Sequence, residues 1–322
     1  MATILVTGGA GYVGSHACKA LAGVGHNPVT FDNLVRGHQS AVKWGPLEVG
    51  DLLDPDRISK VISKHKPEAV MHFAALALVS ESIAKPQLYY RNNVEGTENL
   101  LNAMKGGGVN RLVFSSTCAI YGVPESIPVS ESEFAKPISP YGDSKLRGER
   151  MLAERAKSYG LSYFALRYFN AAGADPEGEI GENHDPEPHL IPNVLAAAAK
   201  GTKLTVHGKS YPTTDGTCVR DYVHVNDLAA AHIRALDIIA GDGQAISANL
   251  GAGKGYSVMQ VIETVERVTG NAIKFDIGPD RPGDPPTLVA DTRHAVDTLG
   301  WEPKRSDLET LVSDAWRWTR NR

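Results

Sequence analysis

A tyrosine and a lysine four positions apart, Tyr141 and Lys145, are the residues of this sequence best suited to acid–base chemistry. Ser139 and Pro140 precede them, and these residue types are typical of a helix N-cap and its first position. Residues at i and i+4 then lie on the same helical face. A nearby ammonium and a helix N-terminus both favour a phenolate, whereas a phenol in water has a pKa of about 10. The pair is therefore a candidate general base, although the same spacing is also common on solvated helices.

A hydroxyl donor is expected near such a tyrosine, at the tip of a strand. The segment FSSTCAIYG (114–122) offers Ser115, Ser116 and Thr117 there. Serine and threonine are also common turn formers at strand ends, so residue types alone do not choose among the three. The next residue, Cys118, is interpreted as a small packed side chain rather than a nucleophile, because no histidine lies nearby in the sequence.

A glycine-rich loop is the second chemical signal. TGGAGYVGS (7–15) places Gly8, Gly11 and Gly14 between a predicted strand and a predicted helix. In that context the glycines let the backbone approach a pyrophosphate, and the helix N-terminus offers its N–H groups to the phosphates. The loop therefore predicts a dinucleotide cofactor.

Acidic residues after the next two strands bear on which dinucleotide binds. Asp32 ends the segment PVTFD and is placed to hold ribose hydroxyls, which favours NAD over NADP because a carboxylate repels a 2′-phosphate. Arg36 lies close by and would suit a 2′-phosphate, but a solvated loop arginine is the simpler interpretation. Asp51 either faces the adenine edge or caps the following helix.

Apolar strands alternate with helical segments through the first half of the chain. The predicted strands are 3–7, 27–31, 46–49, 69–73, 111–115 and 162–167, and the predicted helices lie near 13–24, 54–65, 86–105 and 140–158. This alternation is typical of a parallel, doubly wound sheet. The predicted fold class is therefore α/β, a Rossmann-type doubly wound parallel sheet with a smaller C-terminal mixed α/β substrate domain.

The pattern changes near residue 170. A stretch rich in glycine, proline and acids (170–192) predicts a long loop, followed by an Ala-rich helix (192–200) and a strand (203–208). We expect a cofactor-binding domain over 1–175 and a substrate domain over 176–322, with some of the later chain returning to the first domain.

Composition excludes several function classes. The chain has 322 residues and a formal net charge of −4, and no basic surface for nucleic acid is predicted. Its three cysteines lie far apart, which argues against a disulfide framework or a zinc site and favours a reducing cytosol. No apolar run approaches the roughly 20 residues needed to span a bilayer, and no signal-peptide pattern is present. We expect a cytoplasmic protein without a metal, a nucleic-acid partner or a membrane anchor.

Longer motifs extend through nearly the whole chain. Besides the glycine loop, Asp32 and YGDSK, they are HFAAL (72–76), NNVEGT (92–97), SSTCAIYG (115–122), LRYFNAAGA (166–174), YPTTDGTCVRDYVHVNDLA (211–229), NLGAGKGYS (249–257) and RPGD (281–284). Together they resemble the extended short-chain dehydrogenase/reductases and, among them, the UDP-glucose 4-epimerases. The longest of these motifs are far more specific than a glycine loop alone.

The resemblance implies catalytic roles for Tyr141 as base, Lys145 as its partner on the nicotinamide ribose and Thr117 as hydroxyl donor. Tyr141 would take the proton of the sugar 4-hydroxyl while hydride passes to NAD. A transient 4-keto sugar would then turn over and take the hydride back on its other face. The implied enzyme is an isomerase that interconverts UDP-glucose and UDP-galactose, in galactose metabolism or polysaccharide precursor supply.

The resemblance also implies the binding residues. For NAD these are Gly8, Gly11, Tyr12, Val13, Gly14, Asp32, Asn33, Asp51, Leu52, Phe73, Ala74, Ala75, Asn92, Tyr141, Lys145 and Phe169. For the UDP-sugar they are Thr117, Tyr141, Asn170, His189, Leu190, Thr205, His207, Arg220, Arg281 and Asp284. His189 and His207 depart from the residue types expected at their positions. Ala77 stands where relatives can carry a lysine that contacts the cofactor.

Arg220 and Arg281 are suited to clamp a pyrophosphate, because a guanidinium binds its oxygens in a bidentate manner. The competing interpretation is ion pairing on the surface, for example Arg220 with Asp221 or Arg281 with Asp284.

Two other activities fit the fold less well. A sugar-nucleotide 4,6-dehydratase must eliminate water, and such relatives carry Asp-Glu directly after the threonine, where this chain has Cys118 and Ala119. A non-catalytic NAD-binding protein commonly loses the tyrosine or the lysine, and both are present here.

The choice of sugar and the assembly rest on the resemblance alone. Leu288 aligns with a gate over the sugar, where tyrosine is associated with exclusion of N-acetyl groups and a small residue with their acceptance. We expect UDP-glucose and UDP-galactose, with UDP-GlcNAc or UDP-xylose and UDP-arabinose as the alternative. A homodimer is expected through the helices near 86–105 and 140–158.

Overall fold

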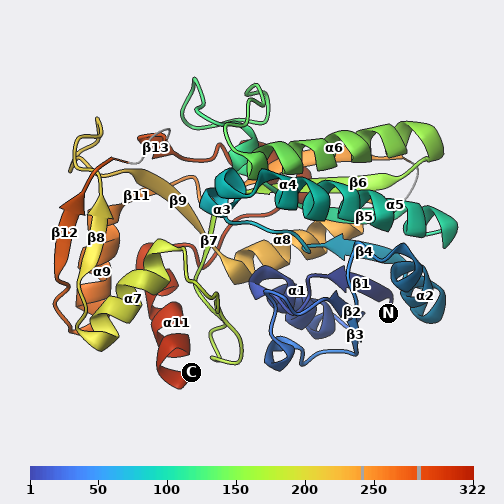
Figure 1. Cartoon of the computed structure of the whole chain (residues 1–322), viewed down its shortest axis with the longest axis horizontal. Coiled ribbons are helices and arrows are strands. Elements are labelled where there is room, and N and C mark those ends of the chain that lie inside the picture. Colours follow the sequence, from blue (N-terminus) through green and yellow to red (C-terminus); the bar gives the residue numbers. More distant parts are fainter. Residues whose placement is uncertain (241–242, 281–283) are drawn as a thin grey trace.

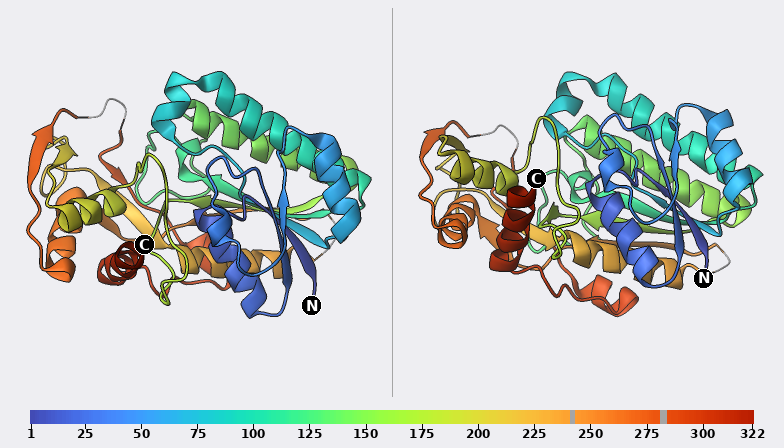
Figure 2. Two further views of the ribbon diagram at one scale, coloured as in Figure 1. Left: turned by 60° about the horizontal axis from the view of Figure 1, so that its bottom comes forward. Right: turned by 90° about the horizontal axis from the view of Figure 1, so that it is seen from below.

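The computed structural model describes residues 1–240, 243–280 and 284–322. A large lobe is built on a seven-stranded sheet, and a smaller lobe lies at one end of that sheet (Figure 1). Figure 2 presents the two lobes from two further sides, with the C-terminal helix in the smaller lobe.

The strands of the large sheet are all parallel. They are β1 (Thr3–Thr7), β2 (Asn27–Asp32), β3 (Leu47–Val49), β4 (Ala69–His72), β5 (Arg111–Thr117), β6 (Ser162–Tyr168) and β10 (Ala245–Leu250). Their order is β10-β6-β5-β4-β1-β2-β3. This order contains the 3-2-1-4-5-6 arrangement of the doubly wound dinucleotide-binding fold, and the predicted fold class is confirmed.

Helices cover both faces of this sheet (Figure 1). On one face lie α2 (Pro55–His65), α5 (Gly96–Gly106) and α6 (Pro140–Tyr159), and on the other lie α1 (Tyr12–Gly23) and α8 (Val225–Ile238). The central strands are buried on both sides, which explains their nearly continuous apolar sequences. In the described ranges, no helix combines the length and the apolar character needed to cross a membrane.

The predicted helix 86–105 contains an irregular turn. It runs as α4 (Pro86–Tyr89), a π-helical turn (Tyr90–Glu95) and α5. Asn93 in this turn accepts a hydrogen bond from Leu76 N at 2.9 Å and donates to Leu76 O at 3.0 Å and to Ser144 Oγ at 2.9 Å. The turn therefore links the loop after β4 to the start of α6.

The smaller lobe has its own core. A four-stranded sheet contains β7 (Asn170–Ala172), β9 (Val219–His224), β11 (Gly255–Ser257) and β13 (Thr287–Leu288), and β8 (Leu204–His207) pairs with β12 (Phe275–Gly278). Three helices pack around them, α7 (Leu190–Lys200), α9 (Val258–Thr269) and α11 (Leu308–Asn321). The chain enters this lobe directly from β6, since β7 begins two residues after β6 ends.

Two local expectations differ from the structure. Residues 170–172, expected to be part of a loop, form β7, because their pairing partner β9 lies about fifty residues further along the chain and is invisible to a local pattern. β10 adds a seventh strand to the large sheet, and its sequence AISANL is too mixed in polarity to predict a buried parallel strand.

One carboxylate joins β9 to the two segments that follow β10 and β13. Asp221 accepts hydrogen bonds from Ala252 N at 2.6 Å, Gly253 N at 2.9 Å and Ala290 N at 3.1 Å. Burial raises the pKa of this carboxyl to about 6, against the effect of the three N–H groups. Asp221 is thus occupied inside the protein, so the expected alternative of an Arg220–Asp221 surface pair is wrong.

Candidate active site

The start of α6 is fixed by its cap. Ser139 Oγ accepts a hydrogen bond from Gly142 N at 3.2 Å, and Pro140 occupies the first helical position, as the sequence predicts. A Cβ at Gly142 would lie 2.5 Å from Ala119 O, so only glycine allows this close approach. The first turn of α6 therefore lies against the segment that follows β5.

This contact brings two predicted catalytic hydroxyls together. The Tyr141 and Thr117 side chains lie beside each other, close enough for the Thr117 hydroxyl to lower the pKa of Tyr141. Thr117 ends β5, and its Oγ1 also accepts a hydrogen bond from Ala119 N at 3.1 Å. Burial raises the pKa of Tyr141 to about 12, and the Thr117 hydroxyl opposes this shift without cancelling it. In the chain by itself, the expected lowering of the tyrosine pKa is therefore wrong, because desolvation of the phenolate dominates.

The structure also distinguishes the three candidate hydroxyls of β5. Ser116 Oγ donates to Glu149 Oε1 at 2.5 Å, and the Ser115 side chain lies beside Tyr168 and lowers the pKa of that phenol against the effect of burial. Thr117 is the residue of the three that faces Tyr141.

Lys145 lies one turn beyond Tyr141 and is 4% exposed. Its Nζ donates to Ser115 O at 2.8 Å and lies 4.9 Å from the centroid of the Phe114 ring. Burial lowers the pKa of Lys145 to about 7, although the charge of Glu149 opposes the shift. The ammonium is thus directed at the backbone of β5, which explains why it does not lower the pKa of Tyr141.

A buried polar network, absent from our predicted residues, anchors α6 to the sheet. Arg167 of β6 donates to both carboxylate oxygens of Glu149 on α6, at 3.0 and 2.7 Å. Its third contact is with Tyr121 OH at 2.9 Å, and this hydroxyl donates to Asn249 Oδ1 of β10 at 2.7 Å. In the sequence, this network could have been suspected because Glu149 and Arg167 are opposite charges in otherwise buried segments, with Glu149 one turn after Lys145.

The glycine loop has the shape that a pyrophosphate requires. A Cβ at Gly8 would lie 2.5 Å from Ala74 N, and one at Gly14 would lie 2.2 Å from Gly8 O, so strand, loop and helix pack too closely for side chains there. Gly11 is the N-cap of α1 and brings no side-chain acceptor. The N–H groups of the first turn, which includes Tyr12 and Val13, are therefore left for an anionic group.

The acidic corner beside this loop is preformed. Asp32 is 7% exposed and accepts hydrogen bonds from Ala10 N at 3.1 Å and Leu34 N at 2.8 Å. Burial raises the pKa of its carboxyl, and the two backbone bonds oppose the shift. Each carboxylate oxygen keeps further acceptor capacity, so Asp32 fits ribose hydroxyls. Asn33 lies beside it and donates to Asp51 Oδ2 at 2.9 Å.

The structure decides between interpretations of two loop residues. Asp51 accepts from Leu53 N at 2.8 Å, whereas Asp54 caps α2, so the capping alternative for Asp51 is wrong. Arg36 is an exposed loop arginine, as interpreted from the sequence, and it pairs with Glu81 at 3.1 Å and donates to Asp185 O at 3.1 Å.

The other predicted cofactor residues surround the same edge of the sheet. Phe73, Ala74 and Ala75 follow β4 and lie partly buried, whereas Ala77 is exposed. The remaining three are Leu52, which is buried against Gly96, Asn92 in the π-helical turn, and Phe169, which packs with Cys118 and Leu288.

The predicted substrate residues fall in separate places of the smaller lobe. Arg220 of β9 pairs with Asp284 at 2.5 Å, and β13 sets Leu288 opposite Arg220 in register. Thr205 and His207 lie on β8 of the two-stranded sheet. The other predicted contacts are Asn170 at the start of β7, His189 and Leu190 at the start of α7, and Arg281, which lies outside the described residues.

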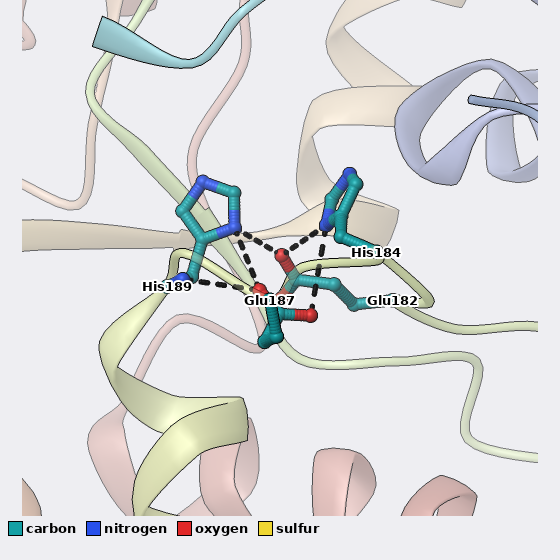
Figure 3. A group of neighbouring side chains, drawn as sticks. All are labelled: Glu182, His184, Glu187 and His189. Atoms are coloured by element: carbon teal, nitrogen blue, oxygen red, sulfur yellow. Dashed lines mark hydrogen bonds and ion pairs between the residues drawn. The ribbon is translucent and has the colours of Figure 1, made fainter. Parts of the chain in front are cut away.

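His189 belongs to a cluster that the sequence analysis does not predict. Figure 3 shows Glu182, His184, Glu187 and His189 with their side chains turned toward one another. Burial lowers the pKa of both histidines, but their contacts with the two carboxylates outweigh it and raise the pKa to about 9 for His184 and about 10 for His189. The signal in the sequence was the spacing E-x-H-x-x-E-x-H inside the predicted loop.

Comparisons with known proteins agree with this geometry. Residues 4–251 match the model of the NAD dependent epimerase/dehydratase family. A UDP-glucose 4-epimerase of Rhizobium meliloti (strain 1021) is 48% identical over 98% of this chain and 96% of its own length. The crystal structure of UDP-glucose 4-epimerase from Brucella ovis in complex with NAD is 49% identical with a TM-score of 0.95, covering 98% of each chain. The enzyme from Bifidobacterium longum in complex with NAD⁺ and UDP is 35% identical with a TM-score of 0.94, covering 99% and 98%.

The low pKa of Lys145 predicts a pH dependence of stability. Its ammonium loses a proton near pH 7 in the folded chain but near pH 10.4 in the unfolded chain. The cost of burying the charge is therefore complete below pH 7 and is relieved as the pH rises from 7 toward 10.4. Relative to Lys145→Met, the free energy of unfolding of the cofactor-free wild type should rise by up to about 1.4 kcal/mol per pH unit in this window.

Urea titrations of both proteins on either side of pH 7 measure this difference. Lys60→Met, on the exposed side of α2, is the matched control and should show no such trend. A difference between wild type and Lys145→Met that stays constant with pH would contradict the prediction.

Proposed function

Because this chain belongs to the NAD dependent epimerase/dehydratase family, we propose that it is an NAD-dependent 4-epimerase that interconverts UDP-glucose and UDP-galactose. The proposal rests most on one observation, the contact of Tyr141 with Thr117 at the carboxyl end of β5. Since β5, β4 and β1 are parallel neighbours, this contact lies at the same sheet edge as the glycine loop. A crevice at that edge is where doubly wound folds bind their ligands.

The cofactor site we propose contains the glycine loop, with Asp32 at the ribose and the residues after β4 beside the loop. When bound, NAD supplies the hydride acceptor and a positive charge near Tyr141. Lys145 is held through Ser115 O and would hold the cofactor ribose with its remaining donors.

The proposed proton chemistry belongs to Tyr141 and Thr117. Tyr141 accepts the proton of the sugar 4-hydroxyl when the 4-keto sugar forms and returns it when the sugar is reduced again. Thr117 would position the sugar oxygen and share the proton, and its place beside Tyr141 supports this role.

Arg220 is the proposed clamp on the UDP pyrophosphate. Its side chain is 13% exposed and is oriented by two contacts, with Asp284 and with Val219 O. A guanidinium carries five N–H groups, so these two contacts leave donors for phosphate oxygens. Holding UDP in this way would let the 4-keto sugar turn over without leaving the protein.

The residues after Thr117 disfavour a dehydratase. Cys118 is buried, and burial raises the pKa of its thiol to about 12, so it is neither an acid nor a base near neutral pH. Ala119 has no ionisable group. Elimination of water needs an acid and a base at these positions, and epimerisation does not.

We further propose that residues 1–175 form the NAD-binding unit and 176–322 the UDP-sugar-binding unit, with α8 and β10 of the later segment built into the first. A cytosolic location is supported by the buried thiols of Cys18 and Cys118.

A panel of UDP-sugars tests the proposed substrate. Leu288 packs against the cluster that contains Cys118 and Phe169, and we propose that it is the gate whose size limits the sugar. We expect the highest kcat/KM for UDP-galactose and UDP-glucose, and Leu288→Ala should raise the relative kcat/KM for N-acetylated sugars by about tenfold or more. Preference of the wild type for UDP-GlcNAc or UDP-xylose would overturn the assignment of the sugar.

Substitution of the base tests the mechanism. Tyr141→Phe removes the proton acceptor but keeps the ring, so NAD should remain bound while kcat falls by at least about 100-fold. Tyr90→Phe removes a phenol hydroxyl beside Arg147 of α6 instead of Thr117, and it should leave kcat within a factor of about two. Turnover of Tyr141→Phe at the wild-type rate would exclude the proposed base.

We also propose a homodimer through the helical segment 86–105, which contains α4, the π-helical turn and α5, and through α6. Val79, Ile83 and Leu88 are exposed apolar side chains on α3 (Val79–Ala84) and α4, and both helices contact α6. An apolar patch beside these helices fits burial against a second copy. Light scattering coupled to size-exclusion chromatography should give twice the monomer mass, and a monomer at micromolar concentration would refute the dimer.

A further inference from the structure

We propose that Glu182, His184, Glu187 and His189 form a binding site for one Zn²⁺ ion, in the segment that leads from β7 into α7. This site lies outside the proposed catalytic chemistry. Four side chains offer two imidazole nitrogens and two carboxylate oxygens, all within 4.8 Å of one another. A mixed set of histidine and carboxylate donors suits zinc and similar first-row ions rather than Mg²⁺ or Ca²⁺.

The spacing of the donor atoms fits four-coordinate zinc. Zinc binds nitrogen and oxygen at about 2.0–2.1 Å, so neighbouring ligand atoms of a tetrahedral site lie about 3.3 Å apart. His184 Nδ1 is 3.1 Å from Glu182 Oε1 and 3.7 Å from Glu187 Oε2. His189 Nδ1 is 3.2 Å from Glu187 Oε1 and also contacts Glu182. Figure 3 shows these side chains turned toward a common centre, which is where the proposed ion would lie.

Charge balance permits a cation at this centre. The Glu182 side chain is 5% exposed, and its ion pairs in the described part of the chain are with the two histidines, not with a lysine or an arginine. A buried carboxylate needs a compensating positive charge. One Zn²⁺ would replace two imidazole protons, so the net charge of the cluster would be unchanged.

The backbone around the cluster is held by three other elements. His38 Nε2 is hydrogen-bonded to Asn183 O at 2.8 Å, and Trp318 of α11 donates to Glu182 O at 2.9 Å. Asn193 of α7 donates to Glu187 O at 3.0 Å and to His189 O at 2.8 Å. The donors are therefore preorganised by contacts that do not depend on an ion.

An ion also has a route to this place. His184 lines a cavity of about 310 Å³ together with Gly11 and Tyr12 of the glycine loop. Tyr12 donates from its hydroxyl to Gly173 O at 2.7 Å, and its ring meets that of His184 edge to face at 6.4 Å. A bound Zn²⁺ would thus join the start of α7 to the cofactor loop, as a closed structural site with four protein ligands.

Calorimetric titration of the full chain with ZnCl₂, after treatment with EDTA and dialysis, tests the proposal. We expect the wild type to bind one Zn²⁺ per chain. The affinity should be at least about 100-fold weaker in the double variant Glu182→Gln, His184→Ala, because loss of a group that only contacts a metal ligand already lowers metal affinity by about 10–100-fold. His189 stays unchanged in this variant, since it is also a proposed UDP-sugar contact. Far-UV circular dichroism verifies that the variant is folded.

Two control variants remove the same types of side chain, a carboxylate and a histidine, outside the proposed site. Glu177→Gln removes a nearby carboxylate that already pairs with Lys19, and His294→Ala removes an exposed histidine on α10 (Arg293–Leu299). Both should bind zinc as the wild type does. Absence of stoichiometric binding to the wild type, or equal affinity in the double variant, would overturn the assignment.

Cobalt gives a second readout that needs no variant. Co²⁺ added to the EDTA-treated wild type should produce the intense visible bands of a four-coordinate ion, and equimolar Zn²⁺ should remove them. The weak spectrum of octahedral cobalt would overturn the proposed four-ligand site.

Discussion

The buried pair of Glu149 and Arg167 is the interaction on which the geometry of this site depends. It joins α6 to β6 through two hydrogen bonds, and Ser116 of β5 donates to the same carboxylate. Loss of one partner from such a pair typically costs about 3–5 kcal/mol, because the other charge remains buried. Tyr141 and Lys145 are carried by the first turns of this helix, so its fixed distance from β5 sets where both side chains meet the sheet. The main effect of this pair is therefore to position Tyr141 and Lys145, more than to stabilise the fold.

A second constraint acts at the sheet edge, where backbone must approach backbone. The backbone of Gly8 packs against Ala74, that of Gly14 against Gly8 and that of Gly142 against Ala119. The contacts are so close that a Cβ on any of these three glycines would clash. These contacts bring β1, β4, β5 and the starts of α1 and α6 into one small volume. The phosphate loop and the tyrosine–threonine pair are thus placed together by packing, and neither depends on a flexible segment to reach the other.

Much of this arrangement could be predicted from the sequence, because its signals are local. Alternating strands and helices, the capped start of α6 and the glycine loop each span fewer than about 25 residues and obey simple periodicities. Three features could not be predicted from the sequence: the pairing of β7 with β9, the addition of β10 and the Arg167–Glu149 pair. Each joins segments that become neighbours only in the folded protein. The choice of Thr117 among three hydroxyls belongs to the same class, since it follows from where Glu149 and Tyr168 hold the other two.

The pKa of Tyr141 shows why residue types and spacing do not predict the protonation state of the candidate pair. An i, i+4 lysine should favour the phenolate, but that expectation presumes a solvated ammonium close to the phenol. Here burial disfavours the charged form of both groups, with a pKa of about 12 for Tyr141 and about 7 for Lys145. The two effects have one cause, the exclusion of water from the junction of β5 and α6. A positive charge brought into this junction would stabilise the phenolate more strongly than it would in water, because the same low dielectric that raises the pKa also strengthens the attraction. For Tyr141 as the proposed base, a cationic ring bound beside it would therefore favour the phenolate.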